Sequence, residues 1–146
     1  MVAGQCCAKR VASWAIANQR GAILTTPIEP LADRAFERGA YANLMQWAKD
    51  ANTDDRAWLY LEAAHIVGQL HFKPHLETHL KMMGLSLRTR DWPEAGGQLL
   101  RLALVPMGHL SGRLPLGNPG RSRVSAFTPM AVRPELAELI ALAREH

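Results

Sequence analysis

Residues 54–69 read DDRAWLYLEAAHIVGQ and predict a helix that is apolar on nearly every side. Asn52 or Thr53 can cap its first turn, and Asp54 favours the positive end of the helix dipole. A helix with so little polar surface is typically buried between neighbouring elements. Its polar residues fall on one narrow stripe, which consists of Asp55, Glu62, His65 and Gln69. We therefore expect this helix to be buried between its neighbours.

Helical signals continue on both sides of this segment. Apolar residues at helical spacing predict a first helix over residues 31–49, and Pro74 suits the first turn of a third helix. The predicted core side of that third helix consists of Leu76, Leu80, Met83 and Leu87. Asp91, three residues before Glu94, starts a predicted fourth helix that extends to residue 105.

The second half of the chain is richer in glycine and proline. Gly96 and Gly97 inside the fourth helix indicate that a neighbouring helix approaches closely. Residues 106–129 predict a long loop whose apolar side chains pack against the helices, and Pro134 begins a last amphipathic helix. The expected fold is all-α, with two antiparallel helical hairpins (tetratricopeptide-like or bundle-like), a long Gly/Pro-rich loop and a C-terminal helix.

Composition limits the classes of protein to which this chain can belong. With 48% hydrophobic and 21% charged residues the chain is not globally disordered, and no apolar run is long enough to span a membrane. We expect one helical domain over residues 26–146, preceded by a poorly ordered N-terminal extension over residues 1–25. The adjacent cysteines Cys6 and Cys7 offer no disulfide framework, so a cytoplasmic location is predicted.

Charge gives little indication of a partner. The net charge of +4 permits an anionic partner, but the few aromatic residues make nucleic-acid binding an unfavoured interpretation. The stretch containing Arg121 and Arg123 can form an anion-binding nest, or simply a turn that glycine and asparagine permit. An unknown protein partner remains open.

Histidine is the chemical lead, because four of the six histidines lie between residues 65 and 79. His75 and His79 are separated by one helical turn and can ligate one ion, and Glu62 and His65 form a similar pair on the preceding helix. A short connection makes the two helices antiparallel neighbours, which brings both pairs to the same end of the hairpin. His71, in the turn, is a weaker candidate ligand.

These ligand types suit a transition metal ion such as Zn, Fe, Ni, Co or Cu, and the spacing does not choose among them. His109 is a further candidate ligand. The alternative is that the histidines are structural or lie on the solvent face, where imidazoles commonly form hydrogen bonds.

Catalytic motifs give no support for an enzyme, and the question stays open with a leaning against it. The chain has no nucleophile elbow, phosphate-binding loop or His-Glu-x-x-His sequence. A carboxylate-bridged iron oxidase would need two Glu-x-x-His motifs, and only Glu62 to His65 provides one. Glu37 is the natural additional carboxylate.

Several motifs together carry a resemblance to a known family. They are the run 62–69, the pair His75-x-x-x-His79, GQLLRL at 97–102, GHLSGRLPLGNPG at 108–120 and VSAFTPM at 124–130. Over residues 35–134 the chain resembles a family of small uncharacterised bacterial proteins with a domain of unknown function. Pro119 stands where this family has Thr, and the first 25 residues match nothing in it.

The resemblance implies a helical protein whose relatives are often encoded beside heavy-metal resistance genes. It implies a metal role for the run that includes His65, and for His75 and His79. Our first hypothesis is a transition-metal-binding accessory protein that buffers, senses or delivers a metal in metal resistance. The alternative is a helical adaptor for protein–protein interaction that binds no metal.

Overall fold

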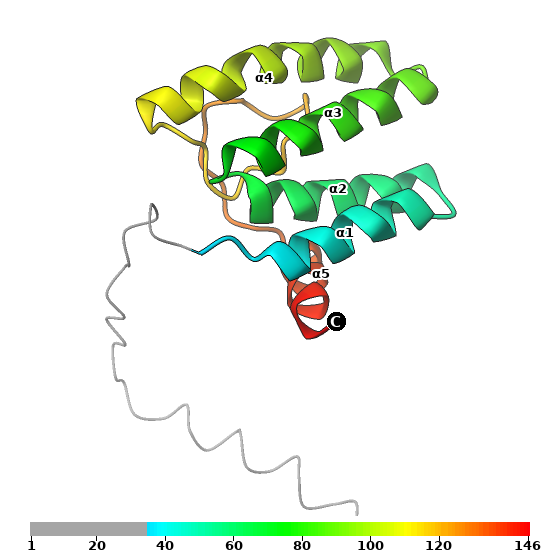
Figure 1. Ribbon diagram of the computed structural model, residues 1–146. Helices are drawn as coiled ribbons and strands as arrows, with labels where there is room; N and C mark the ends of the chain where they lie inside the picture. Colours follow the sequence, from blue (N-terminus) through cyan, green and yellow to red (C-terminus); the bar gives the residue numbers. More distant parts are fainter. Residues whose placement is uncertain (1–34) are drawn as a thin grey trace, which may run out of the picture. The chain divides into compact units, whose positions relative to one another are not determined.

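The computed structural model describes residues 35–146. These residues form five helices and no strand, so the all-α prediction is confirmed (Figure 1). The helices are α1 (Arg38–Asp50), α2 (Asp54–Gly68), α3 (Phe72–Arg88), α4 (Trp92–Ser111) and α5 (Pro134–Glu145). None of them is long and apolar enough to cross a membrane. The expectations for residues 1–25, including Cys6 and Cys7, lie outside the described residues.

The prediction that α2 is buried between neighbouring helices is confirmed. It packs against α1, α3 and α5 (Figure 1). One apolar cluster joins α1, α2 and α5, and its buried residues are Ala40, Tyr41, Leu44, Ala63, Ala64, Leu136, Ile140 and Ala143. A second joins α2 to α3 through Ala57, Trp58, Leu61, Met82 and Leu85. Because apolar clusters lie on two sides of α2, its sequence shows no single apolar face. Thr53 caps this helix by accepting from the backbone N–H of Arg56 at 3.3 Å.

The predicted core side of α3 is wrong. Leu80 and Leu87 are 54% and 49% exposed. The buried residues of this helix are His75, Thr78, His79, Met82, Leu85 and Ser86. The inner face of α3 is therefore largely polar. It meets the polar stripe of α2, of which Glu62, His65 and Gln69 are buried.

Helix α4 is longer than its sequence predicted. It begins at the expected cap, where Asp91 accepts from the backbone N–H of Glu94 at 3.2 Å. It then continues through Pro106 to Ser111, and its C-cap residue is Gly112, whose φ of 66° is left-handed. The predicted loop start at residue 106 is therefore wrong. A proline removes one helical hydrogen bond and crowds the preceding turn, but the helix continues past Pro106.

Residues 112–133 contain no helix or strand and lead back across the bundle to α5 (Figure 1). A Cβ atom at Gly97 of α4 would overlap the side chain of Ser122 in this segment. The close approach predicted at Gly96 and Gly97 exists only at Gly97, and the partner is the 112–133 segment and not a helix. At Gly96 no atom lies within 4 Å of an added Cβ. The contact at Gly97 holds the segment against α4 near the buried histidines.

Candidate metal centre

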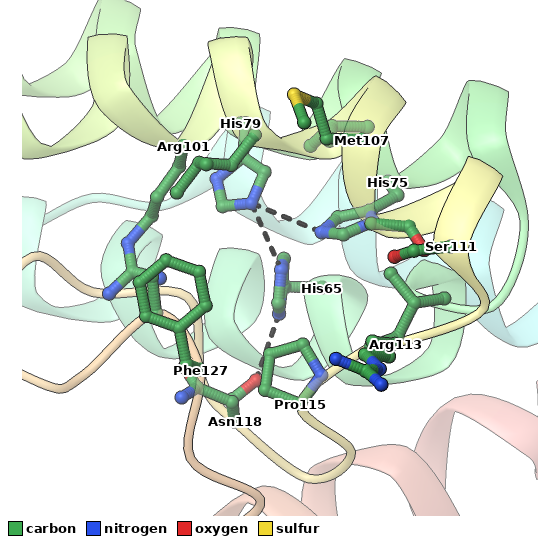
Figure 2. Close-up of a pocket in the computed structure, with 15 residues that line it drawn as sticks. His65, His75, His79, Arg101, Met107, Ser111, Arg113, Pro115, Asn118 and Phe127 are labelled. Atoms are coloured by element: carbon green, nitrogen blue, oxygen red, sulfur yellow. Dashed lines mark hydrogen bonds between the residues drawn. The ribbon is translucent and has the colours of Figure 1, made fainter.

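Three histidine rings converge between α2 and α3. His65 comes from α2, and His75 and His79 lie one turn apart on α3. Only 2%, 5% and 2% of their surfaces are exposed. Nε2 of His79 lies 3.2 Å from Nε2 of His65 and 3.2 Å from Nε2 of His75 (Figure 2). The ligand atoms of all three rings lie within 4.8 Å of one another, so this group could hold a metal ion.

The outer nitrogens of two rings have partners that fix where the protons lie. Nδ1 of His65 lies 2.9 Å from the backbone carbonyl of Asn118, which can only accept. Nδ1 of His79 lies 2.8 Å from Oε1 of Gln98. The Gln98 amide nitrogen donates to Glu94 at 2.8 Å and to a backbone carbonyl at 2.9 Å, so its oxygen faces His79. Each neutral ring therefore carries its proton on Nδ1 and directs the Nε2 lone pair inward.

The third ring is held by another histidine. Nδ1 of His75 lies 3.1 Å from Nε2 of His109 on α4. His109, a candidate ligand from its sequence, thus lies behind His75 and outside the group of three. When His75 donates this hydrogen bond, its own Nε2 lone pair also faces the centre.

Burial keeps these imidazoles neutral. It lowers the pKa of His65 well below the usual range, and the neighbouring His79 and His75 lower it further. Burial, followed by His79 and His109, lowers the pKa of His75 to about 3. Burial likewise lowers the pKa of His79 to about 4. At neutral pH all three rings are therefore neutral, and the facing Nε2 atoms of His65 and His79 are acceptors with no proton between them.

A divalent cation at the centre would satisfy these lone pairs. In a tetrahedral zinc site, Zn–N distances of about 2.0–2.1 Å place adjacent ligand nitrogens about 3.3 Å apart. The two separations of 3.2 Å at His79 Nε2 match this spacing. Hydrogen bonds from the outer Nδ1 atoms to carbonyl oxygens are also the usual support of histidine ligands.

A cavity of about 320 Å³ opens beside the three rings (Figure 2). Its further walls come from α4 and the 112–133 segment and include Arg101, Leu104, Val105, Met107, Arg113, Leu114 and Phe127. Structural zinc sites are usually closed by four protein ligands, whereas three ligands leave a position for water or substrate. A metal held by the three rings would therefore have an accessible fourth position.

The 112–133 segment is built around Asn118, which is fully buried. Its side-chain amide donates to the carbonyls of Ser125 at 2.7 Å and Thr128 at 3.2 Å, and its Oδ1 accepts from the backbone N–H of Gly120 at 3.0 Å. Gly120 has a φ of 82°, and a Cβ there would lie 3.0 Å from the His65 ring. These contacts hold the 112–133 segment against His65. They also direct the backbone carbonyl of Asn118 toward Nδ1 of the His65 ring.

The family model described as "Protein of unknown function (DUF3703)" matches residues 35–140. The chain belongs to this family. The matched region includes all three convergent histidines and the residues that hold them. Comparison with curated proteins and with solved structures gives no match. The family description assigns no activity.

Glu62, predicted as a ligand, has other partners in this member of the family. Its carboxylate accepts from Arg121 at 3.4 Å and from Arg133. Arg121 also pairs with Glu94 at 3.3 Å and stacks on Trp58, with its guanidinium carbon 3.7 Å from the ring centre. Glu62 is absent from the ligand group found among residues 35–146. The guanidinium of Arg121, predicted to bind an anion, is occupied by carboxylates.

The other predicted site residues lie apart from the three rings. His71 is the N-cap residue of α3, and its ring packs on Phe36 with the centres 4.8 Å apart. Arg123 is exposed. Glu37, the additional carboxylate considered for an iron oxidase, accepts from Arg144 at 2.5 and 2.8 Å.

Glu94, Gln98 and Arg101 also belong to the surroundings of the site, although no motif in the sequence predicts this. All three are buried on α4, at spacings of four and three residues that place them on one face. These three residues form a polar stripe on the otherwise apolar helix α4, similar to the stripe on α2. This stripe is the feature of the sequence that indicates a buried polar site. The carbonyl of Asn118 carried no such signal, because any residue supplies a backbone oxygen.

Proposed function

We propose that this protein binds one divalent transition metal ion through Nε2 of His65, His75 and His79. The observation that carries the proposal is the convergence of three buried nitrogens, of which those of His65 and His79 are held as acceptors by partners on Nδ1. Neutral imidazoles suit Zn, Co, Ni, Cu or Fe, and a site of three nitrogens is poorly suited to Mg or Ca. The two separations of 3.2 Å at Nε2 of His79 agree with the ligand spacing of a tetrahedral Zn²⁺ or Co²⁺ site.

We infer further that the protein is a cytoplasmic accessory protein that buffers, senses or delivers this metal. The expected genetic setting of the family, beside heavy-metal resistance genes, supports this role. An opening beside the site also suits metal transfer, because an incoming ligand can occupy the fourth position before the histidines release the ion.

Isothermal titration of the metal-depleted protein with Zn²⁺, Co²⁺, Ni²⁺ and Cu²⁺ tests the metal site. One saturable equivalent is expected for the unaltered chain, and none for a His65→Ala/His79→Ala double variant. His71→Ala is the matched control and should bind as the unaltered protein does. Equal binding by the double variant would overturn the proposal.

A helical adaptor remains the second candidate, and the outer face of α4 favours it. Trp92, Leu99 and Leu110 are 65%, 65% and 88% exposed on this helix. Exposed apolar side chains of this size often mark a protein interface. An adaptor of this kind would bind its partner with the same affinity after treatment with a chelator. A metal-delivery protein would lose its partner or bind it with a different affinity.

A further inference from the structure

We propose that the cavity beside the three histidines binds a small organic carboxylate. One carboxylate oxygen would take the fourth position on the metal, the negative charge would face Arg101, and the hydrocarbon part would lie along the apolar walls. This inference rests on the metal site proposed above and adds the class of ligand that this site accepts.

Arg101 is a buried cation that lines the same cavity as the histidines (Figure 2). It is 7% exposed, and its Nη2 donates to the backbone carbonyls of Arg121 at 2.5 Å and Val124 at 2.6 Å. Within residues 35–146 it forms no ion pair with a carboxylate. Glu94 acts on Arg101 only through its charge, without a direct ion pair. A buried charge that lacks a directly paired counter-charge is unfavourable, so this position favours an anion.

The nearby carboxylates already have partners of opposite charge. Glu62 pairs with Arg121 and Arg133, and Glu94 pairs with Arg121 and accepts from Ser122 at 2.7 Å. Two carboxylates are thus matched by two guanidinium groups. Arg101 and a divalent ion on neutral imidazoles would then be two positive charges on one cavity, neither of them directly paired with a carboxylate.

The remaining walls favour an organic anion over an inorganic one. Leu104, Val105, Leu114 and Phe127 line the cavity. Figure 2 draws both Phe127 and Arg101 among the residues that line it. The volume of about 320 Å³ lies at the lower end of the range of about 300–1,000 Å³ that is typical of small-molecule sites. A phosphate or chloride ion would leave the apolar surface unfilled, whereas a short-chain carboxylate would cover it.

Visible absorption of the Co²⁺-loaded full-length chain tests this proposal, because the Co²⁺ bands respond to a change of ligand. We would titrate the loaded protein with acetate, butyrate and hexanoate, with butyramide as the neutral analogue and phosphate as the inorganic anion. Saturable band shifts are expected for the carboxylates. Affinity should rise about three- to fourfold for each buried methylene group. Butyramide should cause no shift.

Charge-removing variants locate the anion. Arg101→Gln should weaken carboxylate binding about tenfold while Co²⁺ binding persists, since a hydrogen-bonded charge at the anion is lost. Arg101→Lys should retain most of the affinity. Arg123→Gln removes the same charge at an exposed position and should bind carboxylates as the unaltered chain does. If Arg101→Gln fails to fold, the chain-length series on the unaltered protein decides the question alone.

The outcomes separate this proposal from the metal site. Absence of Co²⁺ bands would overturn both. Normal Co²⁺ bands that no carboxylate shifts would overturn only the carboxylate site. Equal affinity for phosphate and hexanoate, with no dependence on chain length, would overturn the organic class and indicate a general anion position.

Discussion

Gln98 accepts a hydrogen bond from Nδ1 of His79 at 2.8 Å, and this contact determines which nitrogen of His79 faces the other two rings. The amide cannot rotate freely, because its nitrogen donates to Glu94 at 2.8 Å and to the carbonyl of Gly120 at 2.9 Å. The orientation of one amide on α4 thereby fixes the ring nitrogen that a metal would meet on α3.

The first prediction concerns this amide. Gln98→Leu keeps the approximate volume but removes the acceptor for His79, and loss of such a partner typically lowers metal affinity about 10- to 100-fold. The free energy of unfolding should also fall by about 1–3 kcal/mol, because the buried His79 N–H is left without a partner. Competition with a chromophoric zinc chelator measures the zinc affinity, and urea denaturation measures the free energy of unfolding.

Gln46→Leu, at an exposed position, is the control and should change neither quantity. Undiminished zinc affinity in Gln98→Leu would contradict the role assigned to Gln98.

The second prediction concerns Gly120, which lies against the His65 ring. Gly120→Ala should destabilise the protein for two reasons: left-handed backbone costs alanine about 1–2 kcal/mol, and the new Cβ would lie 3.0 Å from the ring. Gly112→Ala is the matched control, since its φ of 66° is similar and no atom lies within 4 Å of the new Cβ. We expect Gly120→Ala to lose more stability in urea and also to bind Zn²⁺ more weakly. Equal effects of the two substitutions would show that crowding at His65 is unimportant.

The helices could largely be predicted from the sequence, whereas the inward face of α3 could not. Leu76, Leu80, Met83 and Leu87 are spaced as a core stripe should be, and hydrophobicity favours that side. The neighbouring side, with His75 and His79, is the one that faces α2 and α4. Periodicity locates two stripes on one helix but cannot choose between them when the interior is itself polar.

The candidate site was predictable to a similar extent. Helical spacing and a short connection suffice to bring His65 near His75 and His79, because they depend only on local geometry. The position of Asn118 depends on the path of a 22-residue segment, residues 112–133, with no regular structure, and local spacing carries no information about that path. The partners of Glu62 were missed for the same reason, since Arg121 and Arg133 belong to or adjoin this segment.

The third prediction concerns pH. The metal-free protein should lose stability as the pH falls from 7 to 5. Below a pH of about 6.5 the imidazoles of the unfolded chain take up protons, while those of folded His65, His75 and His79 resist protonation because burial lowers their pKa, to about 3 for His75 and about 4 for His79. The unfolded state then binds more protons, so the free energy of unfolding decreases by up to about 1.4 kcal/mol per pH unit for each group.

Urea denaturation at several pH values, in the presence of a chelator, measures this slope. Replacement of His79 by Gln should reduce the slope, because one titrating group is lost. His71→Gln should leave it unchanged, since His71 is outside the buried group. A slope that is the same in all three proteins would show that the buried imidazoles do not govern acid stability.

The last prediction separates the two roles considered for Glu62. If Glu62 were a metal ligand, Glu62→Gln would weaken zinc binding strongly. Because its carboxylate accepts from Arg121 and Arg133, we expect instead that zinc affinity stays within about twofold while the free energy of unfolding falls by about 2 kcal/mol, the usual contribution of hydrogen bonds to charged groups. Glu138→Gln, an exposed position on α5, controls for the change in net charge and should affect neither quantity. A selective loss of zinc affinity in Glu62→Gln, with stability unchanged, would return Glu62 to the ligand set and contradict the three-histidine site.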